Sequence, residues 1–341
     1  MYRYFLFAIL ICAAAHTVRG ERARYSNANR DVFVLPENAA LGGADICFAR
    51  DGVLHSNPAA APLDSLNKAT LSYAGFYANT FSTSMASYMS RVGKNAGIGA
   101  GVGYLYVPDI IVTTSLDVTG DGDPIWDPEK LSYTSFSEIA FSIVYGQRIL
   151  ERRGIEVSAG ARLHGMRRRL PDDLGYGIGV DAGAVLGLPR RGLRFSLLVD
   201  DITTNYIYWG SSYKDISLPR ARLGAGWRKE IPYLYGAFTV VYATPDVISD
   251  ERVWVRWNVE DEKQVLVEED NAEDLVWSFL YQGRYGLEYF IRNTVALRAG
   301  FTRGRFAFGG GLRLFSALSV DFSYALSELD GTYYVSTGYL W

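Results

Sequence analysis

Residues 318–326 read Leu-Ser-Val-Asp-Phe-Ser-Tyr-Ala-Leu, in which large apolar side chains alternate with small or acidic ones. A period of two indicates a β-strand, because successive side chains of a strand point to opposite faces of the sheet. Similar alternation recurs at residues 306–314 and 295–301, where the second face holds mostly Gly, Ala and Arg. One apolar face and one small, sparsely charged face are typical of a barrel that crosses a membrane.

The composition favours the same class. The chain has 341 residues, including 35 Gly, 24 Tyr, 17 Phe and 7 Trp, while charged residues make up only 21%. Gly permits curvature and close packing inside a barrel, and Tyr and Trp form girdles at the membrane interfaces. A net charge of −3 lacks the basic character of a nucleic-acid-binding protein, so no nucleic-acid partner is expected.

The N-terminus differs from the rest of the chain. Arg3 precedes an apolar stretch at residues 4–15, and a cleavage site could follow Ala15 or Gly20. This arrangement predicts a secretory signal peptide within residues 1–20. The alternative is an anchor helix, for which the apolar stretch is short. One cysteine then remains in the mature chain, which excludes an intramolecular disulfide.

Residues 21–66 lack strand periodicity and are rich in Asn and Pro, which favour turns. Gly42 and Gly43 permit a positive φ, and Asn57 before Pro58 favours an extended or turn conformation. Two interpretations stay open. The segment either is an irregular leader before the barrel or folds into the barrel mouth as a plug.

Residues 67–341 form the expected all-β domain, an antiparallel barrel of about fourteen strands, an even number as in single-chain bacterial barrels. The strands are expected near residues 69–77, 82–91, 97–107, 136–146, 155–166, 176–187, 193–200, 220–228, 234–242, 285–291, 295–301, 306–314, 318–326 and 332–341. The three longest connectors, 108–135, 201–219 and 243–284, all fall on one side. This asymmetry is typical of outer-membrane barrels, which have short periplasmic turns and long outer loops. Within the longest connector we expect a short hairpin of residues 253–257 against 264–267.

The last strand ends on aromatic residues, Tyr339 and Trp341. Such an end resembles the signal by which bacterial outer-membrane barrels are recognised for insertion. We assign this role to the two residues on that resemblance alone.

Two separated motifs resemble the PorV/PorQ family, which is related to the FadL-type outer-membrane transporters. A Leu-Gly-Gly run is followed by Asn-Pro-Ala and then by an alternating strand. The motif residues are Leu41, Gly42, Gly43, Asn57, Pro58 and Ala59. Residues 286–289, 297–300, 306–311 and 318–324 resemble the tail of the same family. The resemblance implies a bacterial outer-membrane barrel of fourteen strands without catalytic residues.

Charges on the expected inner faces form the second set of candidate site residues. They are Glu138, Arg222, Glu288, Arg298, Arg313 and Asp321, with Glu156, Arg162, Arg194 and Arg220 beside them. Such charges either pair with one another and stiffen the barrel, which we favour, or line a selective path for ions.

Metal and catalytic motifs are sparse. Asp117, Asp121 and Asp123 lie in one outer loop and offer the oxygen ligands that calcium prefers. Their spacing does not match an EF-hand, and a solvated acidic loop is the favoured interpretation. His55 and His164 have no partners at metal-binding spacing. With no nucleophile motif either, we expect neither a cofactor nor an enzyme.

Two functions fit these observations. The resemblance implies an accessory of type IX secretion that binds secreted cargo or partner subunits through its loops. The alternative is a FadL-like channel for hydrophobic molecules such as long-chain fatty acids, with Ile46, Phe48 and Leu54 lining a pocket behind the plug. In both, outer-membrane lipid surrounds the barrel. An outer-membrane phospholipase or protease would need a Ser, His and acid set at the rim, which the sequence does not offer.

Overall fold

The structure is a computed structural model. It describes residues 28–48, 53–63, 67–112, 127, 131–211, 214–248, 253–260, 263–270, 279–327 and 330–341. The predicted signal peptide and the acidic residues Asp117, Asp121 and Asp123 lie outside these ranges. No helix within them is long and apolar enough to cross a membrane.

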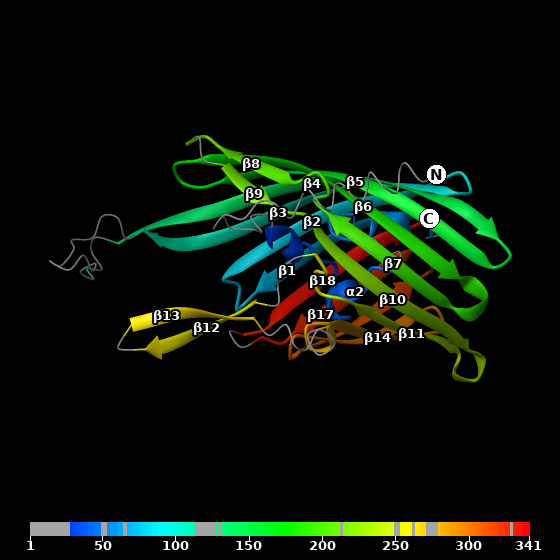
Figure 1. Ribbon diagram of the computed structural model, residues 1–341. Helices are drawn as coiled ribbons and strands as arrows, with labels where there is room; N and C mark the ends of the chain where they lie inside the picture. The colour runs from blue at the N-terminus through cyan, green and yellow to red at the C-terminus, as the bar shows by residue number, and fades with distance from the viewer. Residues whose placement is uncertain are drawn as a thin grey trace.

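Fourteen strands form a closed antiparallel barrel, as the sequence predicts (Figure 1). The strands are β1 (Lys68–Phe76), β2 (Phe81–Val92), β3 (Ala96–Val112), β4 (Ser132–Arg152), β5 (Ile155–Arg169), β6 (Leu174–Leu188), β7 (Leu193–Asp200), β10 (Arg220–Ile231), β11 (Gly236–Ala243), β14 (Arg284–Ile291), β15 (Val295–Thr302), β16 (Arg305–Leu314), β17 (Leu318–Ala325) and β18 (Thr332–Leu340). The ring closes because β1 pairs with β18, with Thr70 opposite Gly338. Closure leaves the first and last strands without a free edge.

Two hairpins add to the barrel at one end. The connector expected at residues 201–219 contains β8 (Asn205–Trp209) and β9 (Lys214–Ser217), and β8 continues the sheet by pairing with β6. The expected hairpin in the longest connector is confirmed as β12 (Val253–Glu260) and β13 (Lys263–Asp270), longer than predicted. Both hairpins lie at what we call the loop end (Figure 1). We call the opposite end, where β18 finishes, the terminal end.

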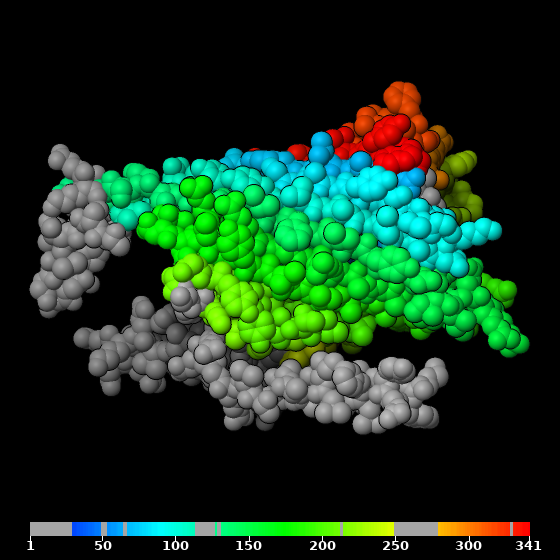
Figure 2. All heavy atoms as spheres, turned by 90° about the horizontal axis from the view of Figure 1, so that it is seen from above, coloured from blue at the N-terminus to red at the C-terminus, as the bar shows by residue number. Residues whose placement is uncertain are grey.

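The outer surface of the barrel is apolar along its length. In β17 the side chain of Phe322 is 49% exposed, whereas the neighbouring Asp321 is 4% exposed and faces inward. The alternation is shared by β15, where Leu297 is 55% exposed. Figure 2 shows this outer surface from one side, with β3 and β4 extending past their neighbours at the loop end. A closed barrel with an apolar outer band is the architecture of outer-membrane proteins.

The N-terminal segment, defined here as residues 28–48 and 53–63, lies inside the barrel. It contains the short helices η2 (Ala28–Val32), α2 (Pro36–Ala39) and η3 (Pro58–Leu63). Its backbone lies directly against the barrel at inward-facing glycines. A Cβ added at Gly300 would be 2.2 Å from the Gly42 nitrogen, and one at Gly160 would be 2.5 Å from the Pro58 carbonyl group. Glycine on the inner face therefore makes room for the segment.

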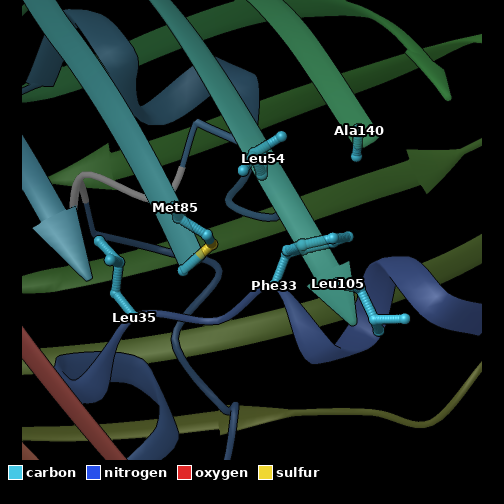
Figure 3. Close-up of a cluster of buried hydrophobic side chains, with 6 residues drawn as sticks. All are labelled: Phe33, Leu35, Leu54, Met85, Leu105 and Ala140. Atoms are coloured by element: carbon cyan, nitrogen blue, oxygen red, sulfur yellow. The ribbon is translucent and has the colours of Figure 1, made fainter. Parts of the chain in front are cut away.

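An apolar cluster joins the N-terminal segment to β2, β3 and β4 (Figure 3). Phe33, Leu35 and Leu54 come from the segment, and Met85 and Leu105 come from the barrel. A fully buried side chain of this size contributes about 1.5–3 kcal/mol. The segment is thus packed into the lumen by apolar burial as well as by polar contacts.

Candidate functional site

A cluster of buried charges lies inside the barrel, where η2 meets β5, β6 and the end of β7. Arg30 of η2 donates from Nη2 to Asp181 Oδ2 at 2.6 Å. Its Nη1 lies 3.6 Å from Asp201 Oδ1 and 3.0 Å from Nε2 of His164. All four side chains are buried. An arginine of the N-terminal segment is therefore held by acidic groups of the barrel.

The next residue of the segment, Asp31, is an acid that pairs with an arginine of the barrel. Asp31 accepts two hydrogen bonds from Arg220, at 2.6 Å and 2.7 Å. This two-bond geometry is the strong form of an arginine–carboxylate pair. Arg220 also lies 3.3 Å from Asp200, which pairs with Arg222 at 2.9 Å as well. Adjacent residues of opposite charge thus fix η2 to the same side of the barrel.

The cluster is balanced in charge. It contains Arg30, Arg162, Arg220 and Arg222, against Asp31, Asp181, Asp200 and Asp201. Breaking a buried pair costs about 3–5 kcal/mol, because the remaining charge has no compensation. We call β5, β6, β7 and β10, which carry the barrel members of this cluster, the ion-paired wall.

Two histidines belong to this region. His164, Asp181 and Asp201 place ligand atoms within 4.8 Å of one another, a grouping that could hold a metal ion. The Arg30 guanidinium lies among these atoms, at 3.2 Å from Asp181 Oδ1, and supplies a positive charge there. His55 Nδ1 lies 3.7 Å from Asp31. Burial, followed by repulsion from Arg222, lowers the pKa of His55 well below 6.5, so this side chain is neutral at neutral pH.

The lumen charges predicted from the sequence fall into four places. Arg222 belongs to the central cluster. Arg298 joins Glu288 and Asp321, each at 2.7 Å, in a separate buried group. The other two occupy different sites: Glu138 accepts hydrogen bonds from Arg168 and Asn29, and Arg313 lies over the ring of Phe290 at 5.4 Å.

The motif residues lie along the contact between the segment and the barrel. Asn57 Nδ2 donates to the carbonyl oxygens of Ile46 and Leu197, both at 3.2 Å, and its Oδ1 accepts from the Ala59 nitrogen. The Ala59 carbonyl accepts a hydrogen bond from Ser158 at 2.7 Å. The Asn-Pro-Ala turn is therefore attached to β5 and β7. Its Leu-Gly-Gly counterpart, residues 41–43, lies against β14 and β15.

Tyr339 and Trp341 lie on the outer surface at the terminal end. Their rings are 5.7 Å apart, and the ring of Trp341 is also 5.7 Å from that of Tyr88. Such a group of aromatic rings suits the membrane interface. Their role as an insertion signal stays a prediction.

Sequence reasoning missed several central residues. Asp181 could have been found, because it continues the inward phase of Gly177, Gly179 and Gly183 in β6. Asp201 follows the end of β7, where alternation stops. Arg30 lies in an aperiodic segment and carries no signal. Its partner Asp181 is 151 positions away, so no local pattern could reveal the pair.

Two cavities border the N-terminal segment. At the terminal end, a cavity of about 540 Å³ is bordered by Phe48 together with Arg190, Arg191, Arg194, Arg228 and Lys229. Toward the loop end, a cavity of about 260 Å³ lies between the segment and the strands β14 to β18. Of the three residues predicted to line a pocket, only Phe48 borders one of these. Ile46 is packed against Leu198, and Leu54 adjoins a gap of only about 10 Å³.

A third hollow lies on the outer surface. Its volume is about 600 Å³, and it is bordered by Leu71, Tyr88, Val102, Leu318 and Tyr339 together with small residues of β1, β2 and β3. The large side chains among them are exposed on the lipid-facing side of the barrel. This hollow is therefore separate from the lumen.

No family model and no curated protein matches the chain. Among solved structures, the fold is similar to a TodX monoaromatic hydrocarbon channel variant, with 11% identity, a TM-score of 0.53 and coverage of 90% of this chain and 98% of that chain. The Pseudomonas putida toluene transporter TodX is similar, at 10% identity, a TM-score of 0.52 and the same coverage. A Pseudomonas aeruginosa FadL homologue matches at 12% identity and a TM-score of 0.44, over 87% of this chain and 95% of that chain. The fold is thus that of bacterial outer-membrane β-barrels.

Proposed function

We propose that this chain is a non-enzymatic outer-membrane channel for small molecules with a large apolar part, and that the N-terminal segment is its plug. The observation that carries the proposal is the filled lumen. Residues 28–48 and 53–63 lie inside the barrel and are held by reversible contacts, namely apolar packing and ion pairs. Because the segment occupies the lumen, the interior differs from the wide water-filled pore that suits polar solutes.

The nature of the contacts explains how passage could be controlled. No covalent bond holds the segment across the lumen in the part of the chain that the structure describes, where Cys47 is a free cysteine. Movement of the segment would therefore open a path. The names of the two TodX structures, a toluene transporter and a monoaromatic hydrocarbon channel, agree with an apolar cargo.

Uptake by whole cells tests the channel. The full-length chain is expressed in a bacterial host whose own channels for hydrophobic molecules have been deleted. We expect faster uptake of labelled toluene and of labelled octanoate than in cells with the empty vector, and unchanged uptake of sucrose. Equal uptake of both apolar probes with and without the protein would refute a channel function. The Asn57→Ala variant, which loses the attachment of the segment to β7, should change the uptake rate.

A secretion accessory of the PorV/PorQ type is the second candidate. The observation that favours it is the hairpin β12–β13, which projects past the barrel at the loop end (Figure 1) and gives a partner a surface outside the membrane. Deletion of residues 253–270 leaves the fourteen barrel strands in place. If the accessory function is right, this deletion abolishes co-purification of secretion subunits or secreted cargo. A full-length protein that captures neither would end this candidate.

A further inference from the structure

We propose that the cavity of about 260 Å³ near the loop end binds a compact organic anion, a carboxylate attached to a single ring or a short alkyl chain, with Arg284 holding the carboxylate. The cavity lies between the N-terminal segment and the strands β14 to β18. This ligand would be the cargo of the proposed channel, and only its role as cargo rests on that proposed function. Binding in the cavity is a separate claim.

The first support is the state of Arg284. This residue begins β14 and faces the lumen, where Gly43 makes room for it. A Cβ added at Gly43 would lie 2.9 Å from Arg284 Nη1. Among the residues that the structure describes, no hydrogen-bond or ion-pair partner of its guanidinium is found. An arginine held inside a barrel without a counter-ion favours an anion from outside the chain.

The other enclosed arginines of the lumen differ from Arg284 in their partners. Those on the inner face that are fully enclosed have carboxylate partners. They are Arg30 with Asp181, Arg162 with Asp181, Arg168 with Glu138, Arg222 with Asp200 and Arg298 with Glu288. Arg284 also faces the lumen, but it is only partly buried and has no such carboxylate partner among the described residues. Since a guanidinium binds a carboxylate through two parallel hydrogen bonds, the missing group has the geometry of a carboxylate.

The charges around the cavity favour an anion as well. Arg303 and Arg305, on the β15–β16 turn, border the cavity with Arg284. Asp31 is the acidic residue among the lining residues, and two hydrogen bonds already commit it to Arg220. The net charge of the lining is therefore positive.

The remaining lining sets the shape and polarity of the ligand. Val34, Ala39, Ala307 and Tyr334 add apolar and aromatic side chains to the lining. Pockets that hold drug-sized ligands have volumes of about 300–1,000 Å³, so a cavity of about 260 Å³ suits a smaller molecule. A ring or a short chain that carries one carboxylate matches both the arginines and the apolar residues of the lining. A long alkyl chain would exceed the cavity, and a neutral hydrocarbon would leave Arg284 without a partner.

Binding to the purified full-length protein in detergent tests the inference, with benzoate, octanoate, hexadecanoate, toluene and inorganic phosphate as probes in calorimetry. We expect benzoate and octanoate to bind, and Arg284→Gln to weaken both by about tenfold or more, since a charge-assisted pair is lost. Arg284→Lys should retain part of the affinity. The matched control is Arg292→Gln, which removes an arginine from the turn after the same strand at the terminal end.

Four results would overturn the proposal. They are unchanged benzoate affinity in Arg284→Gln, toluene binding as tight as benzoate binding, phosphate binding as tight as benzoate binding, and tighter binding of hexadecanoate than of octanoate. If Arg284→Gln does not fold, Ala307→Leu tests the same site, because a larger side chain on the inner face of β16 fills the apolar side and should abolish benzoate binding. Binding without uptake would leave this site standing and remove the channel. Uptake of toluene without Arg284-dependent binding of benzoate would support the channel and refute this site.

Discussion

The two sides of the lumen hold the N-terminal segment in different ways. The ion-paired wall holds η2 through Arg30 and Asp31, which contact barrel groups of opposite charge. Strands β14, β15 and β16, which we call the cavity wall, meet the segment at Gly286 and Gly300, where backbone lies against backbone. The cavity wall also leaves Arg284 facing an open volume. The difference indicates that ion pairs hold the segment on one side of the barrel, whereas on the other side it is held by close packing beside an open cavity.

Removing the segment's arginine should give the largest effect. Arg30→Ala removes the segment's cation from Asp181 and Asp201, although Arg162 still pairs with Asp181, and we expect the docked segment to lose about 3–5 kcal/mol. Proteolysis of residues 28–48 and hydrogen exchange measure this loss. The control is Arg313→Ala, which removes a lumen arginine that lies over Phe290 and should cost about 0.5–1 kcal/mol. Equal protection of the segment in both variants would contradict the comparison.

Crowding the cavity wall should have an intermediate effect. A Cβ at Gly300 would lie 2.2 Å from the Gly42 nitrogen, so Gly300→Ala forces the segment away and should destabilise its docking by about 1–3 kcal/mol. Gly310→Ala is the matched control, because the nearest atom to its added Cβ, the Ala296 oxygen, is 3.5 Å away. The thermal stability and protease protection of both variants provide the measurement. If the control loses as much as the test variant, backbone contact at Gly42 is not the cause.

Loss of the Asn57 side chain should affect the attachment near η3. Asn57→Ala leaves the Ile46 and Leu197 carbonyl oxygens without their donor and removes the acceptor of the Ala59 nitrogen. We expect a loss of about 1–3 kcal/mol. Asn57→Asp keeps the acceptor but not the donor, so its stability should lie between that of the Asn57→Ala variant and that of the unaltered protein. Thermal unfolding followed by electrophoretic mobility measures the order, and an unaltered Asn57→Ala midpoint would rule out this attachment.

Acidification should give the smallest effect, through His55 of the N-terminal segment. Burial lowers the pKa of His55 well below 6.5, whereas the same histidine in a released segment has its ordinary pKa. As the pH falls through about 6.5, the released form therefore takes up a proton that the docked form does not, and docking weakens. Protease protection measured against pH should show this trend in the unaltered protein and less of it in His55→Gln. A stronger dependence in His55→Gln would contradict the assignment.

The sequence predicted the barrel because each strand repeats one simple pattern. In β17 the alternation of Val320 and Phe322 with Asp321 and Ser323 gives the strand, its outer face and its inner face together. The hairpin β8–β9 escaped prediction because its strands are only five and four residues long. The ion pairs of η2 escaped because Asp31 and Arg220 are 189 positions apart. Arg284 lies at a predicted strand edge, but only the structure shows that it faces a cavity.

The connection between the N-terminal segment and the first strand restricts the order of assembly. η3 ends at Leu63, and β1 begins at Lys68 and pairs with β18 along the seam that closes the ring. Because so few residues separate η3 from this seam, the segment is tethered at the place where the barrel last opens to its surroundings. In the closed barrel the tethered segment lies on the inner side of this seam. Biogenesis of this protein would then be a single event, in which the closing ring encloses its own contents.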